Sequence, residues 1–180
     1  QKLPEEEGLR KFTEAYNEVG YDARALGNHD FNYGLDYLSY YVDNNRAPFI
    51  NDNVLDAETN VPFFGKEYTI IEKAGLKIGI MGITTQYISH WESEDHIKGL
   101  KFVSGYDVLS KLAKKLRPQV DILCAMYHGG FESDPLTGEA TEPHTGENEG
   151  YKILTEIPEI DVFLTGHQHR RVNLVTRDTA

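Results

Sequence analysis

Three apolar segments of this chain each run directly into a short polar cluster, and this repeated arrangement limits the possible folds more than any other feature of the sequence. The junctions are Asp22–Leu26 before Gly27-Asn28-His29-Asp30, Val120–Tyr127 before His128-Gly129-Gly130, and Asp161–Thr165 before Gly166-His167-Gln168-His169. In open α/β sheets, ligands bind outside the carboxyl ends of the strands. Loops after different strands can bring such clusters together, so the sequence predicts a polar site at one edge of a sheet.

Helix-like and strand-like segments alternate along the chain, which is the pattern of an α/β fold. The sequence predicts helices at Leu9–Val19, Leu35–Val42, Asp107–Leu116 and Glu149–Ile157. It predicts strands at Asp22–Leu26, Phe49–Asn51, Tyr68–Glu72, Lys77–Ile83, Val120–Tyr127 and Asp161–Thr165. The third and fourth strands, joined near Ala74-Gly75, are expected to form a hairpin. The apolar run of the fifth is typical of a strand that is covered on both faces.

The segment Phe131–Gly146 is rich in Gly, Pro, Thr and acidic residues, so we expect a long surface loop. Loops of this length are often functional. Because the loop closely follows His128, we expect it to border the polar site. A solvated acidic loop without a role explains its composition almost as well.

Composition excludes several classes of function. A chain of 180 residues, 39% of them hydrophobic, suits one domain with a substantial core. The formal net charge of −11 argues against a nucleic-acid polymer as partner, because backbone binding needs clustered Lys and Arg. No apolar run approaches the roughly 18 residues of a membrane span, and no stretch has the pattern of a signal peptide. The one cysteine, Cys124, is interpreted as a small core residue.

The polar clusters contain side chains that bind metal ions. They supply the imidazoles of His128, His167 and His169 and the side-chain amide of Asn28. Imidazole suits Zn, Mn, Fe, Co or Ni, and an amide oxygen adds a harder ligand. Simpler explanations exist for each residue alone: alternate strand residues share a face by chance, and Asn is common in turns. Their joint occurrence after three apolar segments favours a metal site.

The three clusters resemble the motifs of the calcineurin-like metallophosphoesterases. The first, Gly27-Asn28-His29-Asp30, resembles the GNH[DE] motif, Tyr127-His128-Gly129-Gly130 the strand-terminal histidine motif, and Gly166-His167-Gln168-His169 the GHxH motif. They occur in the order of the family, and the resemblance covers nearly the whole chain. More narrowly, Gly27–Tyr37 and Gly146–Tyr151 are similar to the secreted bacterial 2′,3′-cyclic-nucleotide 2′-phosphodiesterase/3′-nucleotidases.

This resemblance implies a layered fold with helices packed on β-sheet, and two divalent ions of Mn, Zn, Fe or Co. It implies that Asn28, His128 and His167 bind the second metal and that His169 binds the first. His29 would face the substrate, stabilise the phosphoryl oxygens and protonate the leaving oxygen. Two ions about 3.5–4 Å apart would acidify a water molecule and clamp the in-line transition state. The substrate-binding residues stay unidentified.

One departure from the family pattern concerns the surroundings of His29. The related 5′-nucleotidases have Asp where this chain has Asn32, and an amide can hydrogen-bond an imidazole but cannot raise its pKa by opposing charge. Asn32 therefore favours the cyclic-nucleotide enzymes over the 5′-nucleotidases. The neighbouring Asp30 is interpreted as holding a turn or capping the helix that starts at Leu35.

A second departure concerns the first metal. The Asp-x-His and Gly-Asp motifs that supply most of its ligands in the family do not precede Asn28. We therefore expect residues 1–180 to be part of a single catalytic domain, incomplete at its N-terminus and without the nucleoside-binding C-terminal domain. The chain alone is expected to be weakly active or inactive.

The sequence thus predicts a metal-dependent phosphoester hydrolase of nucleotide catabolism that acts on 2′,3′-cyclic nucleotides and 3′-nucleotides. The alternatives are a 5′-nucleotidase or sugar-nucleotide hydrolase, and a metal-binding fragment without activity. The expected partners are the nucleotide substrate and the upstream and downstream segments of a parent protein. By resemblance, the expected location is extracellular, in the cell wall or in the periplasm.

Overall fold

The computed structural model describes residues 6–176. Its main sheet has four strands in the order β2-β3-β5-β6, formed by Tyr68–Lys73, Leu76–Thr84, Ile122–His128 and Val162–Thr165. Strand β2 pairs antiparallel with β3 through a hairpin whose turn has positive φ at both Ala74 and Gly75, as a type I′ turn requires. Strands β3, β5 and β6 are parallel. The predicted α/β fold and hairpin are therefore confirmed.

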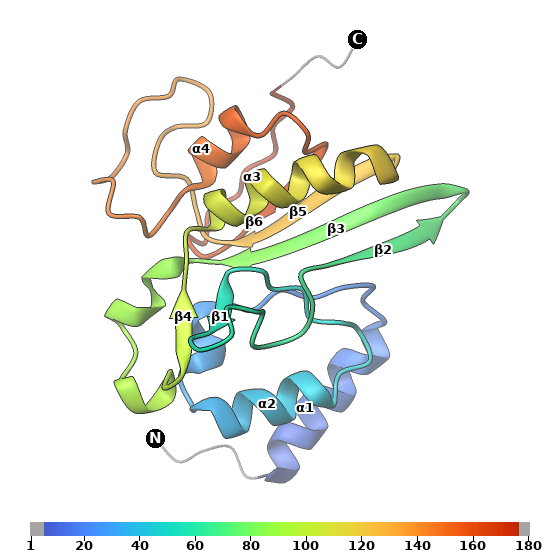
Figure 1. Ribbon diagram of the computed structural model, residues 1–180, viewed down its shortest axis with the longest axis vertical. Coiled ribbons are helices and arrows are strands. Elements are labelled where there is room, and N and C mark those ends of the chain that lie inside the picture. The colour runs from blue at the N-terminus through green and yellow to red at the C-terminus, as the bar shows by residue number, and fades with distance from the viewer. Residues whose placement is uncertain (1–5, 177–180) are drawn as a thin grey trace.

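Two helices, α3 (Gly105–Leu116) and α4 (Gly150–Glu156), cover one face of this sheet (Figure 1). Burial alternates regularly along strand β5, and Leu123, Ala125 and Tyr127 are buried beneath the helices. The intervening Cys124 and Met126 are only half-buried, so the expectation that Val120–Tyr127 is covered on both faces is wrong for the part of the chain that the structure describes. Cys124 is for the same reason not a core residue.

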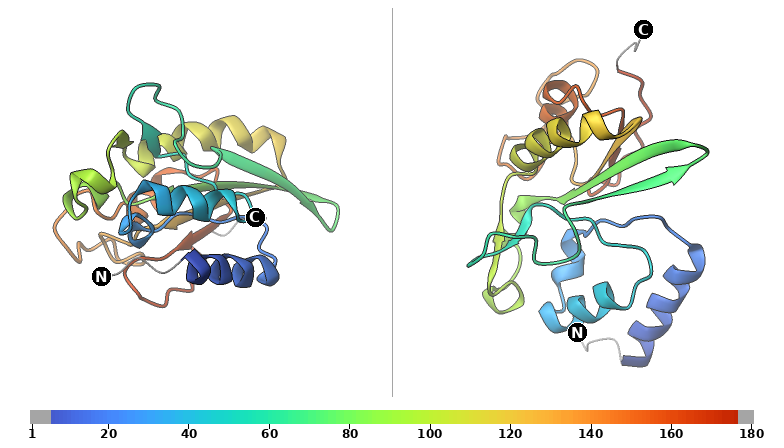
Figure 2. Two further views of the ribbon diagram at one scale, coloured as in Figure 1. Left: turned by 90° about the horizontal axis from the view of Figure 1, so that it is seen from below. Right: turned by 45° about the vertical axis from the view of Figure 1, so that its right-hand side comes forward.

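The other part of the fold contains α1 (Glu6–Val19), α2 (Leu35–Asp43) and an antiparallel ribbon of β1 (Val54–Asp56) and β4 (Leu100–Phe102). Figure 2 shows α1 and α2 on the opposite side of the sheet from α3 and α4. A second core, which includes Leu26, Phe31, Leu38, Phe49, Val54 and Phe64, lies here. Helix α1 ends at Gly20, whose φ of 74° is readily adopted only without a side chain.

The segment after α2 joins the two parts of the fold. The Asp52 N–H donates to Gly82 O at 2.9 Å, so residues around Asp52 lie directly against β3. A Cβ at Gly82 would stand 2.1 Å from Ile50 O, and glycine is therefore required for this close approach.

Two predicted strands do not form as strands. Asp22–Leu26 and Phe49–Asn51 meet only in the isolated bridge Arg24↔Phe49, and a further bridge joins Ile50 to Lys66. Pro48 precedes the second segment and has no N–H to extend a ladder. The chain instead turns from Gly27 into a short 3₁₀ helix, η1 (Asn28–Phe31). Further 3₁₀ helices lie at Gln86–His90 (η2), Glu94–His96 (η3) and Arg117–Gln119 (η4).

Candidate metal and catalytic site

The carboxyl ends of the parallel strands meet at one edge of the sheet. Register pairs Thr84 of β3 with His128 of β5, and Tyr127 of β5 with Thr165 of β6. This alignment places His128 and His167 at the same edge of the sheet, because His128 ends β5 and His167 lies two residues beyond β6. Their ring centroids are 5.4 Å apart.

Asn28 reaches this edge from the other part of the fold. Its Oδ1 lies 2.9 Å from Nε2 of His128. Gly27 allows the approach, because a Cβ at this position would stand 3.0 Å from Cε1 of the His128 ring. The carboxylate of Asp30 accepts the Gly27 N–H at 2.7 Å, which confirms its predicted role in holding the turn. Burial raises the pKa of Asp30.

The segment after β6 holds two histidines in an uncommon backbone conformation. His167 has φ of 69° and His169 has φ of 55°. Few residues other than glycine adopt positive φ, and such conformations persist where the surrounding structure fixes them, often at functional sites. Gly166 N–H donates to Tyr127 O at 3.1 Å, which fixes the start of this turn. His167 Nε2 lies 3.0 Å from Glu147 Oε1, and His169 is exposed.

Gln168 ties the loop 131–146 to the same turn. Its amide accepts from Phe131 N at 3.0 Å and donates to Phe131 O at 3.1 Å and to Glu142 Oε2 at 3.0 Å. Asn148 in turn donates to Glu142 Oε1 at 2.6 Å. The loop therefore adjoins the turn of the GHxH-like motif, although its first residues, Phe131–Ser133, are buried rather than on the surface.

The electrostatic environment keeps His128 neutral. Burial, which is the largest cause, and the nearby imidazoles of His167, His29 and His169 together lower its pKa to about 4. At neutral pH the ring therefore keeps a free lone pair, as a metal ligand requires. Together with the amide oxygen of Asn28, it is a donor set that fits a divalent ion. Within residues 6–176, however, no three His, Cys, Asp or Glu side chains are grouped tightly enough to form a metal site by themselves.

His29 lies beside this donor set on η1 and is exposed. Its Nδ1 is 2.8 Å from Asn32 Oδ1, so position 32 does contact the candidate catalytic histidine. The Asn32 amide nitrogen donates to Glu92, whose other carboxylate oxygen lies 3.0 Å from Nδ1 of His96.

Three residues near the site were not predicted from the sequence: Trp91, Glu92 and Glu147. The Trp91 ring centroid lies 5.5 Å from that of His167. Strand β3 ends at the same edge as β5, and its polar continuation at Thr84-Thr85-Gln86 is a fourth strand-end cluster that marks this region in the sequence. Glu147 lies in the stretch Gly146–Tyr151 that resembles the family, but only the path of the long loop shows that it reaches His167.

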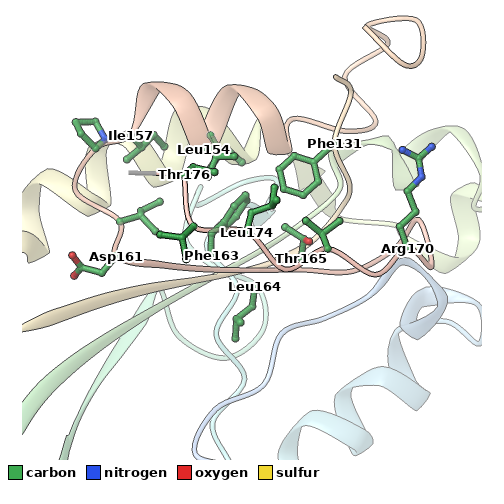
Figure 3. Close-up of a pocket in the computed structure, with 15 residues that line it drawn as sticks. Phe131, Leu154, Ile157, Asp161, Phe163, Leu164, Thr165, Arg170, Leu174 and Thr176 are labelled. Carbon is green, nitrogen blue, oxygen red and sulfur yellow. The ribbon is translucent and has the colours of Figure 1, made fainter. Parts of the chain in front are cut away.

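A separate pocket of about 460 Å³ lies between α4, β6 and residues 170–176 (Figure 3). Phe163, Leu154, Ile157 and Leu174 line it together with polar groups, whereas the side chain of Leu164 points to the opposite face of β6. None of Asn28, His29, His128, His167 and His169 lines it. The candidate metal site at the sheet edge is therefore separate from this pocket.

Comparison with known proteins agrees with this geometry. The sequence profile of the calcineurin-like phosphoesterases matches residues 5–171. A 2′,3′-cyclic-nucleotide 2′-phosphodiesterase/3′-nucleotidase of Salmonella typhimurium is 33% identical over 168 residues, which are 86% of this chain and 24% of that protein. A 5′-nucleotidase of Vibrio cholerae is 32% identical over 87% of this chain and 28% of its own length.

Solved structures give the same result. A candidate 5′-nucleotidase from Staphylococcus aureus, solved with α-ketoglutarate, superposes with a TM-score of 0.85 at 36% identity, over 91% of this chain and 32% of that one. The Bacillus subtilis calcineurin-like phosphoesterase YfkN gives a TM-score of 0.73 at 26% identity, over 88% of this chain and 48% of that one. The chain spans about a quarter of the length of the curated relatives it matches. Among residues 6–176, no helix is long and apolar enough to cross a bilayer.

Proposed function

Since this chain belongs to the calcineurin-like phosphoesterase family, we propose that it carries part of the active site of a metal-dependent hydrolase of 2′,3′-cyclic nucleotides and 3′-nucleotides. The single observation that carries the proposal is the 2.9 Å approach of Asn28 Oδ1 to His128 Nε2, with His29 next in sequence. This contact joins two motifs from opposite parts of the fold at the carboxyl edge of the sheet.

Asn28, His128 and His167 would hold one divalent ion, and His169 would contribute to a second. When bound, two such ions stabilise negative charge on the phosphoryl oxygens and acidify water. His128 is suited to ligation because its low pKa keeps the ring unprotonated. Glu147 accepts a hydrogen bond from His167 Nε2 when that nitrogen carries the proton, so metal ligation through Nε2 requires this contact to be lost.

His29 is proposed as the group that handles the leaving oxygen. Its Nδ1 is engaged by Asn32, so only Nε2 is available to a substrate. In the imidazolium form, Nε2–H would donate a hydrogen bond to a phosphoryl oxygen. It would then transfer its proton to the ribose oxygen as the phosphorus–oxygen ester bond breaks.

The choice between substrates is supported by sequence similarity and by Asn32. The Salmonella relative is named for cyclic nucleotides and 3′-nucleotides, whereas the Vibrio and Staphylococcus proteins favour 5′-nucleotides as the second candidate. Asn32 supports the first candidate, since the 5′-nucleotidases that the motifs resemble carry Asp there. By the same resemblance, we propose an extracellular, cell-wall or periplasmic location, which fractionation of the host cells would test.

The test compares 2′,3′-cyclic AMP, 3′-AMP and 5′-AMP as substrates of the complete polypeptide that carries this chain. Metal content is measured on the same samples. We expect hydrolysis of the first two at rates well above that of 5′-AMP. Preference for 5′-AMP would favour the second candidate. Metal binding without hydrolysis of any of the three substrates would contradict the proposed activity and indicate a metal-binding protein without activity.

A further inference from the structure

A continuous series of hydrogen bonds leads from the candidate catalytic histidine to a buried carboxylate. His29 Nδ1 lies 2.8 Å from Asn32 Oδ1, the Asn32 amide nitrogen donates to Glu92 Oε1, and Glu92 Oε2 lies 3.0 Å from His96 Nδ1. Sixty positions separate Asn32 from Glu92 in the sequence, so this contact is a product of the fold.

We infer that Glu92 is a positioning residue that, through Asn32, fixes the tautomer and the orientation of the His29 ring. This inference rests on the proposed function, because it gives His29 a role toward substrate. It assigns to Glu92 no contact with substrate and no part in metal binding.

The direction of each hydrogen bond follows from the chemistry of the carboxylate. An ionised carboxylate only accepts hydrogen bonds, so the Asn32 side chain must turn its NH₂ group toward Glu92. Its carbonyl oxygen then faces His29 and, in turn, only accepts. His29 must therefore carry a proton on Nδ1. Its Nε2 is left free to bind and release the proton that the proposed reaction transfers to the leaving oxygen. With the Asn32 amide reversed, its oxygen would face the carboxylate of Glu92, which is unfavourable.

Glu92 itself is held firmly enough to act in this way. Its side chain is only 9% exposed, although the adjacent Trp91 and Ser93 are exposed. The N–H groups of Trp91 and Glu92 both lie 3.0 Å from Ile88 O, and the Ile88 side chain is fully buried in the second core. His96 on η3 fixes the second carboxylate oxygen. The backbone of Glu92 and one of its carboxylate oxygens are thus held by structure that does not depend on His29.

Without Glu92, the amide of Asn32 would lose its preference for one orientation. Either the oxygen or the NH₂ group of Asn32 would then face His29, and both neutral tautomers of the ring would be populated. Misplacing a catalytic group in this way lowers turnover more than substrate affinity. Residues that orient groups of an active site through a hydrogen bond are typically worth about 10–100-fold.

The test uses the complete polypeptide loaded with Zn²⁺, and compares Glu92→Ala with Glu92→Gln. Glutamine has nearly the same shape but can donate as well as accept a hydrogen bond, so it removes the acceptor-only character of Glu92 and keeps the packing of the side chain. Glu94→Ala is the matched control, because Glu94 is an exposed acidic residue two positions away. Long-range ¹H–¹⁵N NMR spectra of the His29 ring, recorded at a pH where the ring is neutral, report which nitrogen carries the proton.

We expect the Nδ1–H tautomer of His29 in the unmodified protein and in Glu94→Ala, and a mixture of both tautomers in Glu92→Ala and in Glu92→Gln. We expect kcat to fall about 10–100-fold in Glu92→Ala, with KM changed far less, and to be only partly restored by Glu92→Gln. An Nδ1–H tautomer that persists in folded Glu92→Ala would overturn the inference, as would Nε2–H in the unmodified protein.

The NMR measurement needs no substrate, so absence of hydrolysis would defeat the proposed function and leave the tautomer result to decide on Glu92. If Glu92→Ala does not fold, Glu92→Met decides instead. It removes both carboxylate oxygens but keeps much of the volume of the side chain. A mixture of tautomers in this variant supports the inference, and a retained Nδ1–H tautomer contradicts it.

Discussion

Oδ1 of Asn28 lies 2.9 Å from Nε2 of His128, although 100 positions separate the two residues in the sequence. Asn28 opens a 3₁₀ helix beside the second core, and His128 ends β5, one of the two inner strands of the sheet. The contact therefore depends on the packing of the two parts of the fold. A neutral imidazole and an amide oxygen meet there, and this is the arrangement from which the following predictions start.

Substitution of His128 and of His29 should separate metal binding from chemistry. In the complete polypeptide, we expect His128→Ala to lose bound metal, because it removes the buried neutral ligand. We expect His29→Ala to retain its metal but to lose about 10²–10⁴-fold in turnover, as loss of a general acid does. Elemental analysis and a phosphodiester assay on both variants check this. Metal loss in His29→Ala would show that this ring is a ligand.

Trp91 should report metal binding through its fluorescence. It is the only tryptophan of the sequence, and its ring centroid lies 5.5 Å from that of His167. A Co²⁺ ion held by His167 would lie close to the indole and quench its emission. We expect saturable quenching in the unmodified protein and much weaker quenching in His167→Ala. Equal quenching in the two proteins would mean that the ion binds elsewhere.

Two of the three strand-end clusters could be predicted because each depends on local sequence. The apolar runs before His128 and His167 are strands that stop at a polar motif, and parallel pairing then places the two histidines close together. The hairpin at Ala74-Gly75 was predictable for the same reason, since its turn residues adjoin two β-rich runs.

The parts that depend on packing could not be predicted. Strands β1 and β4 have three residues each, which is too short to show alternation. The segments at Asp22–Leu26 and Phe49–Asn51 have strand-like composition, but their backbones pair only in isolated bridges. Glu92 precedes a 3₁₀ turn without hydrophobic periodicity, and only the fold shows that it reaches Asn32.

Glu149 should stabilise the fold by capping helix α3. Its carboxylate accepts hydrogen bonds from Ser104 Oγ at 2.6 Å and Gly105 N at 2.8 Å, at the N-terminus of that helix. We expect Glu149→Ala to lower the free energy of unfolding by about 1–3 kcal/mol, because it leaves these donors unpaired near the positive end of the helix dipole. Urea denaturation measures the change. Glu139→Ala, at an exposed position of the long loop, is the control and should have little effect.

Asp52 should make the stability of the fold depend on pH. Burial raises its pKa to about 7, and the nearby negative charge of Glu67 acts in the same direction, whereas Lys115 opposes it. The folded state therefore binds the proton of Asp52 more tightly than the unfolded state, whose carboxyl titrates near pH 4. Between those two values the unfolded protein binds fewer protons, so stability falls as pH rises. A single proton contributes a slope of at most about 1.4 kcal/mol per pH unit.

Asp52→Asn keeps the shape of the side chain and removes the titration. We expect it to abolish part of the loss of stability between pH 4 and pH 7, and to be more stable than the unmodified protein at pH 8. Asp56→Asn is the matched control, because hydrogen bonds from Thr59 lower the pKa of Asp56, so its titration lies below this pH range and its difference should stay nearly constant. The difference in unfolding free energy between each variant and the unmodified protein, measured in urea from pH 4 to pH 8, isolates these single groups from the remaining titrating residues. A difference for Asp52→Asn that stays constant over this range would show that Asp52 is ionised throughout it, and that burial does not govern its proton.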